Sequence, residues 1–195
     1  MEYSVHELAI TGENPPAKYI YTDSINPSQD PSIPLPLLEI PVIDFNRITT
    51  PSVGTGAELE RLRSALSSYG CVMDGTVITY LLQDGEVEGL QVLKDEQWFR
   101  VPNVPDALVL HVGDHLEIMS NGEFKSPVHR VVLNPERQRM SVVIASFPEE
   151  GRQIEPLEGL VSGERPRLYR QVKYSIVDQV GYYWSGTRVT DDARI

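Results

Sequence analysis

The sequence predicts a mainly β protein, a β-sandwich or jelly roll, with one helix before the strands and a helical segment after them. From Thr76 onward, apolar residues recur with a period of two, and turn-forming residues divide this stretch into short segments. Ahead of it, leucines recur with the period of a helix. A chain of 195 residues, 41% of them apolar, is long enough to bury one globular core.

The N-terminal region is expected to be an extended arm followed by an edge strand. Residues 1–38 are rich in Pro, Ser and Asn. Proline disfavours helix and biases the residue before it toward extended conformations, so little helix is expected there. Residues 38–45 have the composition of a short strand, and Pro41 is compatible with an edge position because no ladder donor is needed there.

A helix is expected over residues 55–69. Thr55 and Glu58 have the spacing of a capping box, and Gly70 is suited to end the helix. The apolar residues of one helical face are Leu59, Leu62, Leu66 and Tyr69. This face should pack on another part of the protein.

The strands follow this helix. They are expected at residues 76–82, 89–93, 97–101, 107–112, 115–119, 125–133 and 139–147. Asn121-Gly122 is the strongest hairpin turn between them. Residues 174–182 are expected to form a helix that covers one sheet.

Composition excludes several classes of protein. The net charge of −11 argues against nucleic acid and anionic membranes as partners, because both require basic surfaces. Cys71 is the only cysteine, which excludes an internal disulfide and a cysteine-based zinc site. No secretory leader pattern and no apolar stretch of membrane-spanning length is visible, so we expect a cytoplasmic protein. We also expect it to be a monomer.

Four residues carry the candidate chemistry. Asp74 opens a strand, His129 lies in an apolar strand, and Arg139 and Ser141 alternate to the same face of another strand. Taken singly, these residues would be a turn residue, a core histidine and a surface arginine. Taken together, His and Asp are suitable Fe(II) ligands, and an arginine fork beside a hydroxyl is suited to bind the carboxylate of an oxo-acid such as 2-oxoglutarate.

A hairpin register would bring these residues together. If Leu133 pairs with Arg139 across an odd loop of about five residues, His129 pairs with Val143, and His129, Arg139 and Ser141 share one face. The two ends of this array would then lie about 13 Å apart along the strand. An arginine side chain and a five-carbon dicarboxylate together would fill that distance.

The chain resembles the plant 2-oxoglutarate and Fe(II)-dependent dioxygenases. The matching text is DGTVITYLLQD, VEGLQVLKDEQWFRVPNVPDALVLHVGDHLEIMSNGEFKSPVHRVV and NPERQRMSV, and LLEIPVIDF with ELERLRSALSSYGC is similar to the N-terminal segment of the family. Within the family the chain looks closest to the flavonol synthase, anthocyanidin synthase and norcoclaurine synthase-like branch of plant specialised metabolism.

The resemblance implies a fold, a site and a reaction. The fold would be a double-stranded β-helix, a jelly roll, with helices packed outside it. Asp74 and His129 would be Fe(II) ligands, and Arg139 and Ser141 would hold the distal carboxylate of 2-oxoglutarate. The reaction would couple oxidation of 2-oxoglutarate to hydroxylation, desaturation or demethylation of a small molecule.

The chain also departs from the family pattern. A histidine two residues before Asp74 would complete the iron triad, and Val72 occupies that position. The text SSYGCV runs directly into MDGTV, so the central region of the family is missing between an N-terminal part, 1–72, and an incomplete jelly roll, 73–195. His6, His111 and His115 lie where the family has no metal ligand. We expect them to be surface or core residues, with His111 left open as a substitute ligand.

Three functions remain open at this point. The chain is an active enzyme of this family, an impaired truncated isoform, or a non-catalytic module that retains a carboxylate pocket around Arg139 and binds a small acid or a partner protein. Two protein ligands hold Fe(II) less firmly than three, which favours impaired catalysis.

Overall fold

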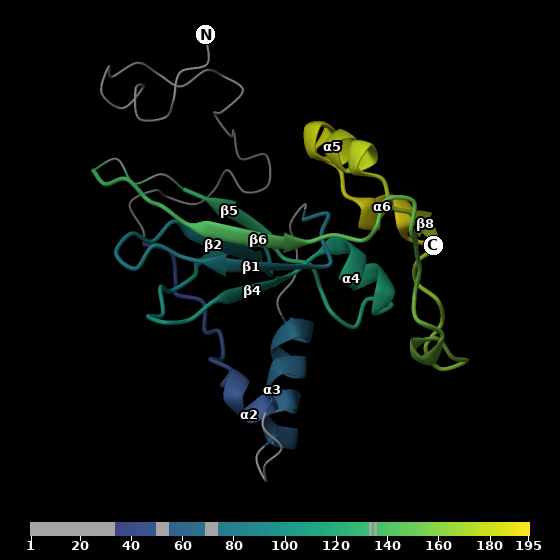
Figure 1. Ribbon diagram of the computed structural model, residues 1–195, viewed down its shortest axis with the longest axis horizontal. Helices are drawn as coiled ribbons and strands as arrows, with labels where there is room; N and C mark the ends of the chain where they lie inside the picture. The colour runs from purple at the N-terminus through teal and green to yellow at the C-terminus, as the bar shows by residue number, and fades with distance from the viewer. Residues whose placement is uncertain (1–33, 50–54, 69–73, 133, 135) are drawn as a thin grey trace.

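The computed structural model describes residues 34–49, 55–68, 74–132, 134 and 136–195. Two three-stranded antiparallel sheets face each other, with strand orders β4-β1-β6 and β3-β2-β5, and a short pair, β7-β8, lies near the C-terminal helices (Figure 1). The strands are β1 Ile78–Leu82, β2 Leu90–Lys94, β3 Gln97–Arg100, β4 Val109–Val112, β5 Val128–Val131, β6 Val142–Ser146, β7 Gln153–Ile154 and β8 Val172–Lys173. The helices are α2 Phe45–Thr49, α3 Thr55–Ser68, α4 Asp114–Met119, α5 Ile176–Ser185 and α6 Val189–Ala193, with a 3-10 turn at Glu158–Leu160. The mainly β prediction is confirmed.

One apolar core lies between the two sheets. Leu81 from β1 and Leu90 and Val92 from β2 are buried in it, and Val109 from β4 packs against them. The inner face of β1 and β4 also carries Thr79, which is buried and lies opposite His111 in the register. This interior is where the side chains of the candidate site converge.

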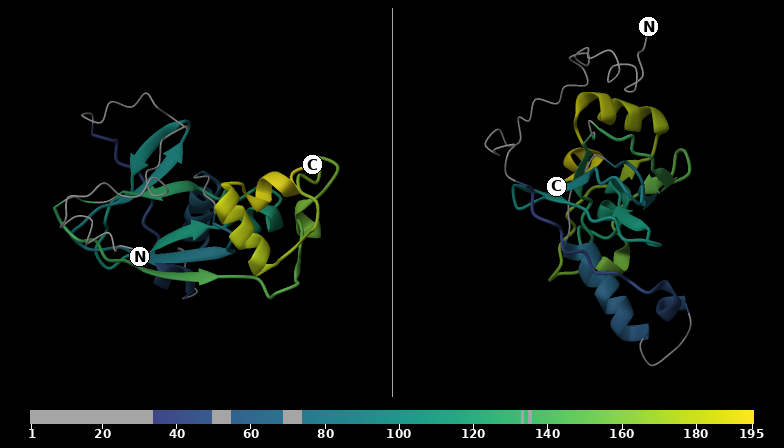
Figure 2. Two further views of the ribbon diagram at one scale, coloured as in Figure 1. Left: turned by 90° about the horizontal axis from the view of Figure 1, so that it is seen from above. Right: turned by 90° about the vertical axis from the view of Figure 1, so that its left-hand side faces the viewer.

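A second core lies at the helical end of the molecule. It is formed by residues of α4, β7 and α6 and by residues on either side of β8, namely Ile118, Ile154, Tyr169, Tyr174, Val189 and Ala193. Figures 1 and 2 show α4, α5 and α6 gathered at this end, while α2 and α3 project from the sheets on another side. The two cores share no residue.

The expected edge strand at residues 38–45 is wrong. No strand is present over these residues, and only an isolated bridge precedes them, between Leu37 and Arg100 of β3. The amide of Leu38 donates to the carbonyl of Arg100 at 2.8 Å, and the amide of Arg100 donates to the carbonyl of Pro36 at 2.9 Å. Beyond this contact the chain turns into α2. Pro41 has no amide hydrogen, so it could not have extended a ladder.

The expected strand at residues 115–119 is also wrong, because this segment is the helix α4. Its polar residues Asp114, His115 and Glu117 are buried beside Ile118, so the alternation of polar and apolar residues does not mark an exposed and a buried face. Asn121 and Gly122 have positive φ angles of 52° and 78° and end this helix instead of closing a hairpin.

The helix α3 confirms the helix expected near residues 55–69, but it packs on α2 and not as a cover over a sheet. The Glu58 carboxylate accepts a hydrogen bond from the amide of Asp44 at 2.8 Å, which joins the two helices. Leu59 remains exposed. Tyr69, Gly70, Cys71 and Val72 lie outside the described residues, as does the expected arm up to residue 33.

The tail helix is confirmed as α5, and its expected role as a sheet cover is wrong. Val177 and Trp184 are 73% and 78% exposed, so much of its apolar surface faces solvent. It ends at Gly186, whose φ of 70° lies in the left-handed region that suits glycine. None of the described helices is both long and apolar enough to cross a membrane.

The outward face of the sheet β4-β1-β6 is apolar and exposed. Tyr80 pairs with Leu110 on one side and with Ile144 on the other, so these three side chains form one row. Leu82 and Val142 form the next row, and all five are exposed. In the described part of the chain, β6 pairs with β1 alone and is an edge strand.

Candidate functional site

The strands that carry His129 and Arg139 do not form a hairpin. β5 pairs with β2, which places His129 opposite Val92, and β6 pairs with β1, which places Val143 opposite Leu81. The expected pairing of His129 with Val143 is therefore wrong. The segment between β5 and β6 crosses from one sheet to the other, because each strand completes a different sheet around a central strand.

His129 nevertheless faces the interior. Its ring lies 4.6 Å from the ring of His111, centroid to centroid, with the two planes tilted by 58°. Its Nδ1 atom is buried and has no hydrogen-bond partner among the described residues. Burial lowers the pKa of His129, and the negative charge of Asp74 opposes that shift. Burial therefore favours the neutral imidazole, and Asp74 acts against it.

His111 comes to this place from the opposite sheet. It lies on β4, opposite Thr79 of β1, and only 3% of it is exposed. Burial, reinforced by the neighbouring His129, lowers the pKa of His111 to about 3. It is therefore a neutral imidazole at neutral pH, the form in which histidine binds metals.

Asp74 lies at the entrance of β1. Its carbonyl accepts the amide of Asp114 at 2.7 Å, which fixes the chain immediately before β1 against the start of α4. Val72, which stands where a ligand histidine was expected, lies outside the described residues. Across the described ranges, no three His, Cys, Asp or Glu side chains lie close enough together to hold a metal ion.

Arg139 and Ser141 lie just before β6. The Arg139 Nη1 atom donates to the Ser141 hydroxyl at 3.3 Å. The other two nitrogens of the guanidinium, Nε and Nη2, are buried and have no partner in the part of the chain that the structure describes. A buried charged fork without an acceptor is costly, so this geometry favours the binding of an anion.

Gly89 provides the space for that arginine. A Cβ atom placed on Gly89 would lie 2.8 Å from Cδ of Arg139 and 2.9 Å from the carbonyl oxygen of Val132. The Gly89 carbonyl also accepts a hydrogen bond from the amide of Val132 at 2.8 Å, which holds Gly89 next to the end of β5. The sequence predicted Gly89 only as the start of a strand, and the space that it leaves for Arg139 was not predicted. A glycine in a strand pattern often marks a close approach of another part of the chain to the backbone.

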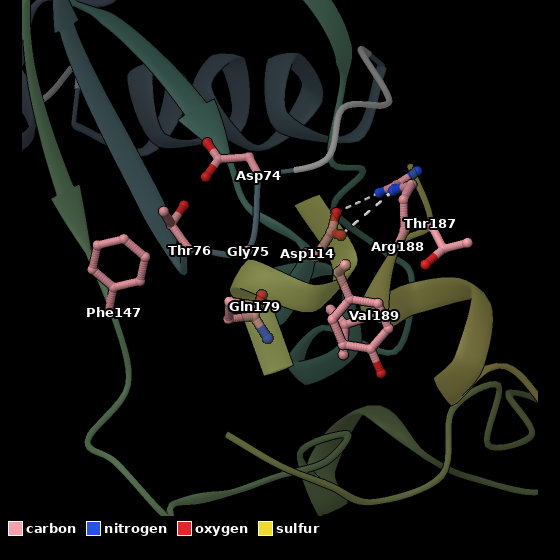
Figure 3. Close-up of a pocket in the computed structure, with 10 residues that line it drawn as sticks. Asp74, Gly75, Thr76, Asp114, Phe147, Gln179, Thr187, Arg188 and Val189 are labelled. Atoms are coloured by element: carbon pink, nitrogen blue, oxygen red, sulfur yellow. Dashed lines mark hydrogen bonds and ion pairs between the residues drawn. The ribbon is translucent and has the colours of Figure 1, made fainter. Parts of the chain in front are cut away.

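A small cavity of about 180 Å³ opens beside Asp74 (Figure 3). Its lining includes Gly75, Thr76, Asp114, Gln179 and Arg188. Figure 3 shows the Arg188 guanidinium directed at the Asp114 carboxylate, at a distance of 2.5 Å between Nη2 and Oδ1. Burial raises the pKa of Asp114 to about 6, although Arg188 acts in the other direction.

This pair was not expected from the sequence, because its members are 74 positions apart. The Ser126 hydroxyl also donates to Asp114, at 2.7 Å. The cavity is lined by neither His129 nor Arg139. It is therefore separate from the carboxylate-binding end of the candidate site.

The described residues thus fit one half of the expected site. The unpartnered Arg139 fork beside Ser141 fits a carboxylate. The metal half does not fit in the same way, because Asp74 and His129 are the only two of the expected ligands present, and no third side chain joins them across the described ranges.

Comparisons with known proteins agree with this geometry. Residues 64–148 match the 2OG-Fe(II) oxygenase superfamily. The chain is 41% identical over 101 residues to codeine O-demethylase from Papaver somniferum, covering 52% of this chain and 28% of that protein. It is 43% identical over 101 residues to flavonol synthase 1 from Crocosmia x crocosmiiflora, covering 52% and 30%, and 37% identical over 121 residues to S-norcoclaurine synthase 1 from Coptis japonica, covering 62% and 33%.

Solved structures lead to the same family. The crystal structure of JOX2 in complex with 2OG, Fe and JA is 32% identical, with a TM-score of 0.54, over 63% of this chain and 37% of that one. The dioxygenase for auxin oxidation from rice is 29% identical, with a TM-score of 0.55, over 62% and 41%. The chain spans about a third of the length of these curated relatives. Over residues 64–148 it is similar to the 2OG-Fe(II) oxygenase superfamily, and the relatives it matches include plant enzymes of specialised metabolism.

Proposed function

We propose that this chain binds the distal carboxylate of 2-oxoglutarate at Arg139 and Ser141, and that its oxygenase activity is impaired because its metal centre is incomplete. The family works with Fe(II) and 2-oxoglutarate on small molecules, and the contact between Arg139 and Ser141 supports a carboxylate site of that kind in this chain. A plant specialised metabolite would be the substrate of the ancestral activity. The monomeric state and the cytoplasmic location remain predictions.

The observation that carries the proposal is the state of the Arg139 guanidinium. Two of its nitrogens are buried without an acceptor, and the third contacts Ser141. A dicarboxylate would supply two parallel acceptors to the fork and a third contact to the hydroxyl, which together offset the cost of burying the charge. Arg137, two residues away, is exposed and already paired with Glu86, so it offers no comparable site.

The impaired activity follows from the ligands. Asp74 and His129 are two candidate iron ligands, and the residue at the position of the third is Val72. Loss of an outer partner of a metal ligand already costs about 10–100-fold in affinity or activity. When bound in the family, Fe(II) supplies the chelation of the oxo-acid and the activation of oxygen, and here neither is expected at full strength.

The second candidate function is a non-catalytic module that binds small acids. It is favoured by the fact that the Arg139 pocket is assembled from β2, the end of β5 and the approach to β6 without any metal ligand taking part. Such a module would bind a dicarboxylate by its distal end only. It would not distinguish a 2-oxo acid from the same acid without the oxo group.

A titration in metal-free buffer tests the carboxylate site. We expect 2-oxoglutarate and glutarate to bind with similar affinity, measured by calorimetry, and Arg139→Lys to weaken both by about 10-fold or more, because lysine cannot form two parallel hydrogen bonds. Arg137→Lys is the matched control and should leave both affinities unchanged. Binding that is the same in Arg139→Lys as in the wild type would refute the site.

Addition of Fe(II) without oxygen separates the two candidates from an active enzyme. An intact centre chelates 2-oxoglutarate and gives a metal-to-ligand charge-transfer band, whereas glutarate gives none. We expect a weak band or no band. A band of normal strength that is lost in His129→Ala would contradict the proposed impairment and identify the chain as a competent enzyme.

A further inference from the structure

A carboxylate from the connection between β1 and β2 holds the segment that carries Arg139. The last backbone pair between β1 and β6 joins Leu82 and Val142. Two residues beyond that pair, the Asp84 Oδ2 atom accepts a hydrogen bond from the amide of Met140 at 3.0 Å. The side chain of Asp84 therefore continues the ladder between the two strands, in place of a backbone carbonyl.

Met140 lies between the two residues of the proposed carboxylate site. Its neighbours Arg139 and Ser141 contact each other, with 3.3 Å between the Arg139 Nη1 atom and the Ser141 hydroxyl. Met140 itself is 73% exposed, so its side chain faces solvent. In an extended segment, successive side chains alternate between two faces. A hydrogen bond at the Met140 amide therefore holds the backbone in the orientation that turns both neighbouring side chains to the opposite face.

Asp84 is itself fixed by a turn. Its Oδ1 atom accepts hydrogen bonds from the amides of Glu86 at 2.9 Å and Val87 at 3.1 Å. An aspartate that accepts the amides following it in this way stabilises a turn. The same connection carries Gly89, whose lack of a side chain leaves room for the stem of Arg139. One short segment thus holds the backbone beside the arginine and also borders its stem.

Asp84 places a negative charge near a site proposed for an anion. Hydrogen bonds from the amides of Met140 and Glu86 hold the pKa of Asp84 below its usual range, so its carboxylate is ionised at neutral pH. By charge alone, it disfavours a nearby carboxylate. Two effects on binding therefore have opposite signs. Removal of the charge should tighten the binding of a dicarboxylate, whereas removal of a positioning contact should weaken it.

We propose that Asp84 is a positioning residue for the binding of 2-oxoglutarate and similar dicarboxylates. Its contact with the Met140 amide holds the side chains of Arg139 and Ser141 on one face before the ligand binds. This inference rests on the proposed function of the Arg139 site. A site that is ordered in advance avoids the cost of ordering its side chains when the ligand arrives, and therefore binds more tightly.

Two substitutions separate this role from a contribution to stability. In Asp84→Asn, the amide oxygen can keep both contacts in the turn, while the NH₂ group faces the Met140 amide and cannot accept from it. Asp84→Ala loses all three contacts. We expect both variants to bind 2-oxoglutarate and glutarate about 3–10-fold more weakly than the wild type in metal-free calorimetry, although each has lost a negative charge. In urea, Asp84→Ala should unfold at a lower concentration than Asp84→Asn.

Glu86→Gln is the matched control. It removes one negative charge from the same connection, and the Glu86 side chain pairs with the exposed Arg137. It leaves the contact between Asp84 and Met140 in place. This variant should bind both acids as tightly as the wild type, or slightly more tightly.

Hydrogen exchange of the ligand-free protein tests the contact without any acid. The Met140 amide should exchange faster in both Asp84 variants than in the wild type, and at an unchanged rate in Glu86→Gln. Wild-type affinity for 2-oxoglutarate in a folded Asp84→Ala would overturn the inference, as would a loss in Glu86→Gln as large as in Asp84→Asn. In both cases the Arg139 site stands if Arg139→Lys still weakens binding. If the wild type binds neither acid, the Arg139 site and this inference fail together.

Discussion

Gly89→Ala is the substitution that most directly tests how the proposed carboxylate site at Arg139 is built. The added methyl group would lie 2.8 Å from Cδ of Arg139 and 2.9 Å from the backbone oxygen of Val132. Both separations are shorter than real contacts allow. The arginine stem can move, but the Val132 oxygen belongs to backbone that is held by the hydrogen bond from the Val132 amide to the Gly89 carbonyl. The two short contacts must therefore be relieved by a shift of Arg139 and by local backbone movement.

The magnitude follows from two opposing effects. Overpacking at a buried position costs about 1–3 kcal/mol. Replacement of glycine by alanine gains about 0.4–1 kcal/mol from the lower entropy of the unfolded chain. We therefore expect Gly89→Ala to lower the free energy of unfolding by about 1–2 kcal/mol and, by displacing the guanidinium, to weaken 2-oxoglutarate binding about 10-fold.

Gly85→Ala is the matched control for this prediction. Gly85 lies in the same connection between β1 and β2, and a Cβ atom placed there meets nothing within 4 Å. The control should be neutral or slightly stabilising and should bind 2-oxoglutarate as the wild type does. Urea unfolding and calorimetry measure both quantities. The reasoning fails if Gly89→Ala matches Gly85→Ala in stability and in binding, because the arginine would then not be packed against Gly89.

Three further predictions concern stability and association. Tyr169→Phe removes the hydroxyl that donates to the buried Glu117 carboxylate at 2.7 Å, and should lower the free energy of unfolding in urea by about 1–3 kcal/mol. Tyr80→Phe on the exposed face should change it little, and equal effects of the two substitutions would contradict this. Burial lowers the pKa of His115 below its usual 6.5. The folded state therefore binds the proton less tightly than the unfolded state. As a result, the free energy of unfolding should fall as the pH drops below 6.5. His115 contributes at most about 1.4 kcal/mol per pH unit to that slope, and a slope unchanged in His115→Gln would show that it contributes none. Ile144 is 65% exposed on the outward sheet face, so Ile144→Lys should reduce aggregation measured by light scattering. It should change the free energy of unfolding by less than about 0.5 kcal/mol. Unchanged aggregation would show that chains associate through another surface.

The strands of the two sheets were largely predictable because one face of each is buried. In β1, Thr79 and Leu81 are buried while Tyr80 and Leu82 are exposed, which is the alternation that a period of two encodes. α4 was not predictable in this way, because its buried face contains Asp114 and Glu117. Their burial depends on Arg188 and Tyr169, which are far away in the sequence.

The types of site residue were predictable, and their arrangement was not. Arg139 and Ser141 were expected beside each other, and the structure places them in contact. The predicted pairing of His129 with Val143 was wrong. It required strands adjacent in sequence to pair, whereas β5 and β6 join different sheets. The contact between His111 and His129 and the space at Gly89 both depend on tertiary packing, for which no local pattern exists.

The two separate cores have a consequence for how the molecule opens. One core lies between the sheets and the other is formed around α4, α6 and β7, with no residue in common. Polar contacts around Asp114 and Glu117 join α4 to α6 and to the segment before β8. The helical end can therefore unfold as a cooperative unit of its own while the sheets stay paired. In hydrogen exchange, the amides of α6 should then exchange through a lower-energy opening than those of β1 and β2.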